Sequence, residues 1–564
     1  MTIFIVLLLA VSFCPSTPTT NIHNRPACLN APGGASSRDI SAAITHDHIH
    51  HVFQLCAKGW HHSTSTDLVH WTHRGIGLHE WPSGFVVVDP YTHELCAGFR
   101  GSGGSTSSTS STSSASLVLR CAVDDHNTTS TQPLAWSTPE TMLNVTFWRF
   151  LPLDPFRPFQ DTDGQWYVGV ALDACNATHF GQNKTTTVCT TGGQIDLWTS
   201  PVLRGNHAKW RRTTTPMFTS NTTLFGKTRQ PHGEPHEFVT VDFLGRLPST
   251  DDGATNAKPL TLPLPPNDDY RVFFNNPYYA RGSTSFFVGH QHDGAAFTPL
   301  YESMLDWSEF HLMEVPGNKT GLEALNMSKN NPSGGRLGMT RTLGSDQGNR
   351  VTGGGRRVAV GWVSASDNMF SNPPTSLNVQ SLPRDLSFHG NQTHSPPQLY
   401  QAFVPELKTL RKPETQRTIT TFNSISYGLG QHIELSATFH SDNGFPDQFG
   451  LEVFKGQHES TSIVVYSKYQ VVCINGTLQG AVTLRCGPLY PNSDVHSFPN
   501  KEVVSMHVYL DHILVEVIVN NITAITASVN PSGMADGIGL MGDNATMRGE
   551  VTAWRLAGIE REWE

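Results

Sequence analysis

Several marks of other protein classes are missing from this sequence of 564 residues. A formal net charge of −9 gives a chain of this length no polyelectrolyte character, so we expect no nucleic acid partner. No C-x-x-C pair occurs, which leaves zinc and thioredoxin-like chemistry without support. Long segments with helical periodicity are lacking, and beyond residue 14 no apolar run reaches the length of a transmembrane helix. The mature chain is therefore expected to have no membrane partner.

The main apolar run lies at the N-terminus, over residues 3–14. It is too short to span a bilayer and has the length of a signal-peptide core, although a buried strand is the alternative. We expect residues 1–20 to be a signal peptide and the protein to be secreted or extracellular, with the vacuole as another destination. Eleven N-x-S/T sequons agree with a secretory route. They begin at Asn127, Asn144, Asn176, Asn183, Asn221, Asn318, Asn326, Asn391, Asn475, Asn521 and Asn544.

The nine cysteines fit an oxidising compartment. Loss of Cys14 with the signal peptide would leave an even number. Cys473 and Cys486 flank a hairpin-like stretch, and Cys175 and Cys189 flank another loop. Both pairs are candidates for local disulfides.

Composition and strand pattern favour an all-β protein of two domains, since 564 residues exceed one compact core. The chain holds 49 glycines and 36 prolines, which suit short strands and many turns. Short β-rich runs recur, for example over residues 50–54, 165–170 and 357–363. A sandwich, a barrel and a propeller all fit this pattern.

Two separated segments carry a resemblance to a known family. Residues 59–71 read GWHHSTSTDLVHW, and residues 357–362, RVAVGW, are followed at 381–386 by SLPRDL. They closely resemble the W-G-H-A-x-S-x-D-L-V-H-W and G-W…L-P-R-E-L stretches of glycoside hydrolase family 32, the invertases, inulinases and fructan-active enzymes. The resemblance implies a five-bladed β-propeller over residues 21–408 and a β-sandwich over 409–564. Residues 506–520 resemble the sandwich signature, in which Asp511 and Glu516 are expected to be structural or interdomain residues.

The resemblance implies a retaining glycosidase, which needs a carboxylate nucleophile and a carboxyl acid/base. The family's nucleophile lies in N-D-P-N-G near the mature N-terminus. Residues 30–34, NAPGG, fill that slot with Ala31 in place of the aspartate, which would make the protein an inactive relative. The family's spacing of roughly sixteen residues to a strand-ending glutamine, here Gln54, favours Asp39 instead.

Two further carboxylates follow from the family motifs. Asp154 in L-D-P matches R-D-P and is expected to bind the fructosyl hydroxyls as ring charge develops, while Leu153 stands where the motif has arginine. Glu234 in E-P-H-E-F matches E-C-P-D and is the expected acid/base, with its pKa raised by burial or by neighbouring carboxylates. Glu237 is the competing candidate.

Other contacts are implied for the sugar. Gln54 and Trp60 occupy positions at which the family contacts the fructosyl unit, and Ser83 lies in a loose match to its S-G-S. Histidines at 46, 48 and 50 would share one face of a strand and invite a metal hypothesis. The family needs neither metal nor other cofactor, so strand-surface or sugar-contacting histidines are expected.

These observations predict a secreted retaining β-fructofuranosidase that hydrolyses terminal fructosyl bonds of sucrose or fructans through a covalent fructosyl-enzyme. The alternatives are an inactive fructan-binding relative and a fructosyltransferase. Arabinofuranosidase activity on the same propeller fits less well. The choice among sucrose, inulin and levan depends on loops, and the oligomeric state is left open.

We predict that the mature protein contains no free thiol and carries N-linked glycans. Thiol labelling of the denatured, unreduced protein should be far below one equivalent, and enzymatic deglycosylation should lower its mass. Stoichiometric labelling, or an unchanged mass, would contradict this expectation.

Overall fold

The computed structural model describes residues 38–557 except for a set of internal segments. The segments left out are 57–58, 79–83, 102–111, 124–133, 149–153, 156, 162, 174–192, 220–237, 246–269, 278–284, 291–295, 308–335, 345–355, 365–377, 390–397, 479–480, 491–501, 513, 530 and 532–534. The predicted signal peptide, the cysteines at 175 and 189 and all but four sequons therefore lie outside the described residues. No helix in the described part of the chain is long and apolar enough to cross a membrane.

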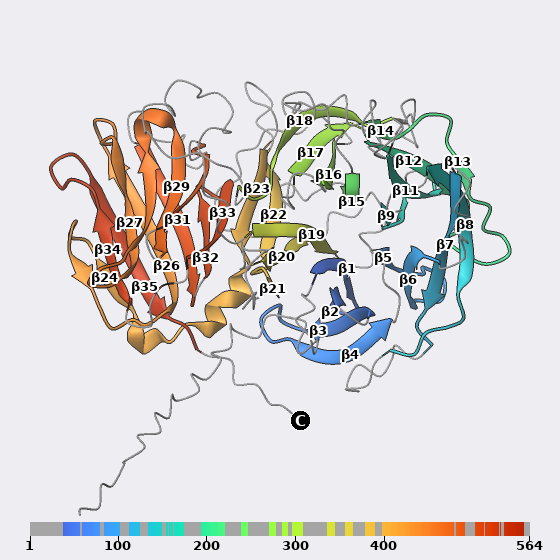
Figure 1. Ribbon diagram of the computed structural model, residues 1–564, viewed down its shortest axis with the longest axis horizontal. Helices are drawn as coiled ribbons and strands as arrows, with labels where there is room; N and C mark the ends of the chain where they lie inside the picture. The colour runs from blue at the N-terminus through green and yellow to red at the C-terminus, as the bar shows by residue number, and fades with distance from the viewer. Residues whose placement is uncertain are drawn as a thin grey trace, which may run out of the picture.

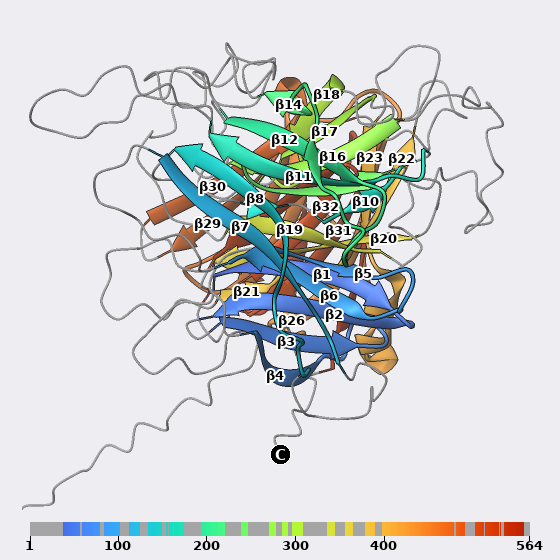
Figure 2. The same ribbon diagram turned by 90° about the vertical axis from the view of Figure 1, so that its right-hand side faces the viewer.

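Five antiparallel sheets are arranged around one axis as the blades of a propeller (Figure 1). Blades 1 and 2 contain β1 (Arg38–His46), β2 (Ile49–Cys56), β3 (Gly59–Ser65) and β4 (Thr72–Leu78), then β5 (Gly84–Val88), β6 (Leu95–Arg100), β7 (Thr112–Cys121) and β8 (Glu140–Trp148). Blade 3 contains β9 (Asp154–Pro155), β10 (Phe159–Gln160), β11 (Trp166–Asp173), β12 (Gly193–Ser200), β13 (Arg211–Arg212) and β14 (Phe218–Thr219). Figure 2 shows these three blades from outside.

Blades 4 and 5 complete the ring. They contain β15 (Phe238–Gly245), β16 (Tyr270–Pro277), β17 (Ser285–His290) and β18 (Thr298–Met304), then β19 (Arg336–Gly344), β20 (Arg357–Ser364), β21 (Asn378–Gln380), β22 (Arg384–His389) and β23 (Gln398–Phe403). The inner strands β1, β5, β9, β15 and β19 follow one another around the axis, and β19 packs beside β1 (Figure 1).

The strand order fixes which end of the axis each inner strand starts from. In every blade the chain enters at the inner strand and then moves outward through antiparallel neighbours. The path across a blade comprises four antiparallel passes, so the outermost strand ends where the inner strand began. The next inner strand therefore starts at that same end. We call it the entry end of the propeller.

Apolar clusters lie between successive blades. One joins blades 1 and 2 around Phe53, Trp60 and Phe99. Another joins blades 2 and 3 around Phe85 and Trp166. Blades 3 and 4 and blades 5 and 1 are joined in the same manner. The sheets of blades 1, 2 and 3 thus bury both faces against their neighbours, which explains why strands such as β5 are buried at every position instead of at alternate positions.

After β23 the chain forms the 3-10 helices η6 (Pro405–Leu410) and η7 (Pro413–Thr415) and enters a sandwich of two six-stranded sheets. One sheet has the order β24 (Arg417–Ile419), β35 (Arg548–Arg555), β26 (His432–Ser441), β31 (Glu502–Asp511), β32 (Leu514–Val519) and β33 (Thr523–Ser528). The other has the order β25 (Ile425–Ser426), β34 (Gly537–Met541), β27 (Gln448–Lys455), β28 (Thr461–Tyr466), β29 (Val471–Leu478) and β30 (Ala481–Pro488), with η8 (Ser467–Tyr469) before β29.

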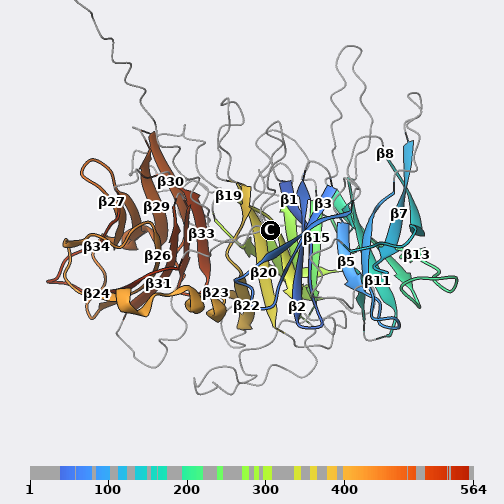
Figure 3. The same ribbon diagram turned by 90° about the horizontal axis from the view of Figure 1, so that it is seen from below.

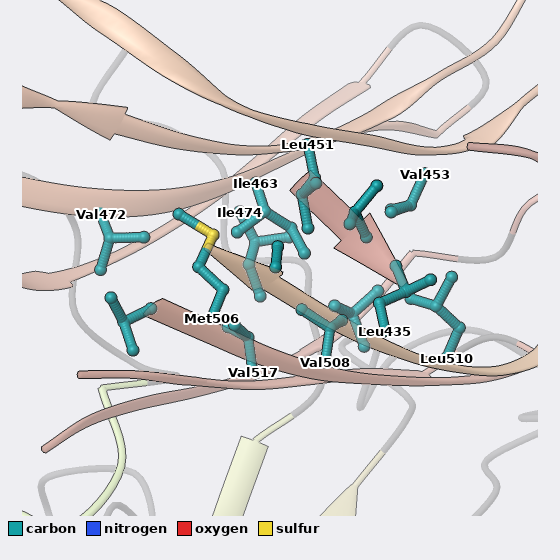
Figure 4. Packing of buried hydrophobic residues seen from close by; sticks show 14 of the residues in the cluster. Leu435, Leu451, Val453, Ile463, Val472, Ile474, Met506, Val508, Leu510 and Val517 are labelled. Carbon is teal, nitrogen blue, oxygen red and sulfur yellow. The ribbon is translucent and has the colours of Figure 1, made fainter. Parts of the chain in front are cut away.

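The inner faces of these two sheets form the largest apolar cluster described. Aliphatic side chains such as Leu451, Ile463 and Val508 interdigitate between the sheets, and Met506 lies among them (Figure 4). The predicted fold class, a five-bladed propeller followed by a β-sandwich, is confirmed. The predicted boundary between residues 408 and 409 falls within η6 and stays a prediction.

Two disulfides join neighbouring strands. Cys473 of β29 is bonded to Cys486 of β30, as the sequence indicated. Cys96 of β6 is bonded to Cys121 of β7, a pair that the spacing did not reveal.

A buried ionic network ties the propeller to the sandwich, which lies beside it (Figure 3). Arg384 at the start of β22 is 1% exposed and donates to Asp306, which follows β18, at 2.9 Å. It also donates to Glu516 of β32 at 3.1 Å. The second carboxylate oxygen of Glu516 accepts a bond from the backbone N–H of Leu382. The expected interdomain role of Glu516 is thereby confirmed.

Main-chain bonds and one large side chain reinforce the same interface. The backbone N–H of Gln401 in β23 donates to the carbonyl of Asn521, and that of Trp307 donates to Ala524. Trp307 follows blade 4 yet belongs to the apolar core of the sandwich, where it is 2% exposed. The two domains are consequently packed as one unit.

We predict that Arg384→Met lowers the free energy of unfolding by about 3–5 kcal/mol, because two buried carboxylates lose their cation. Arg548→Met is the matched control, since Arg548 pairs with Asp442 and both side chains are exposed. The free energy of unfolding of Arg548→Met should fall by less than about 1 kcal/mol. Urea unfolding of both variants measures the difference, and equal losses would show that the network is not stabilising.

Candidate functional site at the entry end

Asp39 lies near the start of the innermost strand of blade 1. The residues on either side of Asp39 pair with β2, Arg38 with Leu55 and Ile40 with Gln54. The register of this pairing is irregular both before and after Ile40. Such irregularities locally change the direction of a strand and often occur next to active sites. The backbone of Asp39 therefore lies beside Gln54, which agrees with the spacing that the sequence suggested.

Asp154 occupies the equivalent position in blade 3. It is the first residue of β9, and it pairs with Ala171 of β11. Since inner strands all start from the entry end, the backbones of Asp39 and Asp154 lie at the same end of the axis.

A contact between blades 1 and 3 supports a common level for the two aspartates. Arg157 is 7% exposed, and its Nη1 lies 3.5 Å from the carbonyl oxygen of Ala43 in β1. Arg157 is three residues beyond Asp154, and Ala43 is four beyond Asp39. The contact therefore agrees with a location of the two aspartate backbones at the same end of the axis. Nothing in the sequence marked Arg157, whose neighbours Phe156 and Pro158 are not characteristic of a functional site.

The remaining predicted carboxylates and Ser83 lie outside the described residues, as does Ala31. Glu234 and Glu237 precede the start of β15 at Phe238 in the sequence, by four residues and one residue. Ser83 directly precedes β5, which starts at Gly84. Both inner strands start from the entry end.

Gln54 and Trp60 are buried side chains near this end. Gln54 is 3% exposed, and Trp60 is fully buried in the cluster between blades 1 and 2. Gly84 lies against the indole, and a Cβ there would approach Trp60 to 2.9 Å and the carbonyl of Gly98 to 2.1 Å. These contacts show that Trp60 is a residue of the apolar core. Its predicted contact with sugar stays a prediction.

The histidines of blade 1 are arranged differently from the expectation. A tight turn at Asp47 and His48, both with positive φ, separates β1 from β2, so residues 46, 48 and 50 do not share a strand face. The prediction of one strand face was wrong because the alternating positions belong to two strands and the turn between them. Among the described residues, no group of three or more His, Cys, Asp or Glu side chains is arranged to hold a metal ion.

Two of these histidines form a buried pair. The rings of His51 and His62 stack, with 3.0 Å between Nδ1 of His51 and Nε2 of His62, and Phe53 stacks on His62. Burial lowers the pKa of His51 to about 3, with further lowering by His46 and His50. Burial also lowers the pKa of His62 well below its usual value. Both rings are neutral near pH 7.

The comparisons with known proteins agree with this architecture. Residues 406–555 match the model for the C-terminal domain of glycosyl hydrolases family 32. No curated protein matches the chain in sequence. A variant of fructan 1-exohydrolase IIa from Cichorium intybus, solved with 1-kestose, has a TM-score of 0.63 at 15% identity, over 96% of this chain and 98% of that one.

Two fungal structures are similar to a comparable degree. A β-fructofuranosidase of Aspergillus kawachii has a TM-score of 0.64 at 13% identity, over 97% of this chain and 96% of that one. A fructosyltransferase of A. japonicus has a TM-score of 0.63 at 13% identity, over 97% and 99%. These likenesses concern the fold of a propeller joined to a sandwich. Together with the C-terminal match, they agree with the resemblance to glycoside hydrolase family 32 that the sequence motifs indicated.

We predict that stability falls as the pH drops below about 6.5. The unfolded chain binds protons on His51 and His62 there, whereas the native pair stays neutral down to about pH 3 for His51. Thermal unfolding at pH 7.5 and pH 5 measures the loss. Between pH 7.5 and pH 5, the double variant His51→Gln/His62→Gln should lose less thermal stability than the wild type. The control His207→Gln, at an exposed position, should lose as much as the wild type. An unchanged difference in the double variant would contradict the assignment.

Proposed function

We propose that the protein is a secreted retaining β-fructofuranosidase that releases terminal fructosyl units from sucrose or fructans. The observation that carries the proposal is the position of Asp39 and Asp154, each at the start of an inner strand and both at the entry end. Glu234 and Ser83 precede two further inner strands in the sequence, which supports their assignment to the same end.

The chemistry follows from the three carboxyl groups. Asp39 attacks C2 of the fructosyl unit while Glu234 protonates the departing oxygen, which gives a covalent fructosyl-enzyme. Glu234 then acts as the base that activates water, and the intermediate is hydrolysed. Asp154 accepts hydrogen bonds from sugar hydroxyls that strengthen as positive charge develops on the ring. The carboxyl groups of Asp39 and Glu234 should be about 5–5.5 Å apart.

Fructosyl transfer is the nearest alternative activity, and the structural likeness to a fructosyltransferase supports it as an alternative. The first step is shared, and only the acceptor differs. Incubation of the secreted protein with sucrose, inulin and levan, followed by separation of the products, tests both activities. Free fructose indicates hydrolysis, and longer oligosaccharides indicate transfer. Binding of fructan without any product would favour the inactive relative.

We predict that Asp39→Asn abolishes fructose release, because an amide cannot form the covalent intermediate. Ala31→Asp should leave the rate of the wild type unchanged, since that carboxylate would lie outside the site. Both variants are compared for folding by their unfolding midpoints. Activity that survives in Asp39→Asn and rises in Ala31→Asp would move the nucleophile position to residue 31.

We predict that Asp154→Asn folds normally and lowers kcat by at least about 100-fold with a smaller change in KM. The reason is that Asp154 binds the sugar most strongly in the transition state. Steady-state kinetics on the best substrate separates the two constants. A rise in KM alone would make Asp154 an ordinary binding residue.

A further inference from the structure

The sandwich carries three N-x-S/T sequons that the sequence alone does not rank as sites of modification. They are Asn475-Gly476-Thr477, Asn521-Ile522-Thr523 and Asn544-Ala545-Thr546. Each has threonine at its third position and none has proline at its second, so all three meet the sequence requirement for N-linked glycosylation. Their surroundings in the folded protein differ strongly.

Asn544 lies in the turn between β34 and β35. Four consecutive residues of this turn are exposed, Asp543, Asn544, Ala545 and Thr546. The turn is closed by other groups, since the carbonyl oxygen of Asp543 accepts the backbone N–H groups of Thr546 and Met547. The carboxylate of Asp543 accepts the backbone N–H of Ala545. The side chain of Asn544 takes no part in these bonds, so a group attached to its Nδ2 extends into solvent without breaking them.

Asn521 lies in the turn between β32 and β33, where its neighbour Asn520 provides a direct comparison. Both residues have positive φ, as the central residues of tight hairpin turns often do. Asn520 is 2% exposed, and its Oδ1 accepts the backbone N–H of Ser505 while its Nδ2 donates to the carbonyl of Tyr490. Asn521 is exposed. The turn thus holds one asparagine inward and the other outward, and the outward one belongs to the sequon.

Asn475 lies within a sheet. Its strand β29 is paired on both sides, and Asn475 stands between Ser462 of β28 and Leu484 of β30. Its Oδ1 is buried and has no hydrogen-bond partner among the described residues. Cys473 precedes it by two positions on the same face of the strand and is fully buried together with Cys486. An oligosaccharide on Nδ2 of Asn475 would have to lie on this covered face.

The chemistry of N-glycosylation acts before the fold does. An oligosaccharide is transferred from a lipid-linked diphosphate donor, so that Nδ2 forms a bond to the anomeric carbon of the first sugar, the bond from that carbon to the diphosphate oxygen breaks, and the amide proton passes to a base. The acceptor is the extended chain, in which all three sequons are accessible. A chain with sugar at an exposed turn folds as before, whereas a chain with sugar on Asn475 must bury a strongly hydrated group. Only the first kind reaches the folded, secreted state.

We propose, on the basis of the secretory route contained in the proposed function, that Asn521 and Asn544 carry N-linked oligosaccharides in the folded protein and that Asn475 does not.

Peptide mapping of the wild-type protein from a eukaryotic host tests this assignment. The secreted protein is denatured and treated with peptide:N-glycosidase in water labelled with heavy oxygen, which converts each glycosylated asparagine to a labelled aspartate. The peptides with Asn521 and Asn544 should be mostly labelled, and the peptide with Asn475 should be recovered without label. The single variants Asn521→Gln and Asn544→Gln should each lose the mass of one oligosaccharide. Asn475→Gln is the matched control and should keep the mass of the wild type.

Label on Asn475, or an unlabelled Asn521 or Asn544, would overturn the proposal. Because the mapping uses the wild-type chain, its outcome does not depend on whether a variant folds. Absence of label from every sequon, in secreted or retained protein, would overturn it as well. Fructose release by the same preparation shows separately whether the proposed activity holds.

Discussion

The arrangement of the two domains depends on the charge of Arg384. Its guanidinium is held between Asp306 of the propeller and Glu516 of the sandwich, all of them almost completely buried. A buried ion pair contributes little net stability over apolar packing, but removal of one partner is severe because the remaining charge has no solvent. Such a group accepts few alternative geometries. The network therefore favours one docking of the domains, and the apolar side chains of Trp307 and Phe403 pack at the same interface.

A second constraint places the candidate site. The path across each blade comprises four antiparallel passes, so inner strands start from one end of the axis, and residues at those starts converge although they are far apart in the sequence. Asp39 and Asp154 are separated by 115 positions (154 − 39) and still share the entry end. The topology thus brings the proposed site residues to one end of the axis. Among the described strands none pairs with the inner edges, which leave carbonyl groups facing the channel, and Arg157 contacts one of these.

Much of this could be predicted from the sequence, because the informative residues occur in contiguous motifs. Glu516 was predicted to be a structural or interdomain residue, and it accepts a bond from Arg384 across the domain contact. The spacing to Gln54 favoured Asp39 as the nucleophile, and that assignment stays a prediction. The failures have physical reasons. The alternating histidines at 46, 48 and 50 cross a two-residue turn, which composition did not mark because neither Asp47 nor His48 is glycine. Arg157 was missed because its contact with Ala43 joins blades that are distant in the sequence. Cys96 and Cys121 are 25 residues apart, and only the pairing of β6 with β7 brings them together.

The central claim is that the carboxylate of Asp39 forms a covalent bond to the fructosyl unit. The most direct measurement is peptide mapping by mass spectrometry of wild-type protein quenched in acid during turnover of sucrose or inulin. The account predicts a peptide that contains Asp39 and is heavier by one hexosyl residue, and no such peptide from Asp39→Asn. A label on any other carboxylate, or product formation with no labelled peptide under conditions that trap the intermediate of a known retaining enzyme, would contradict it.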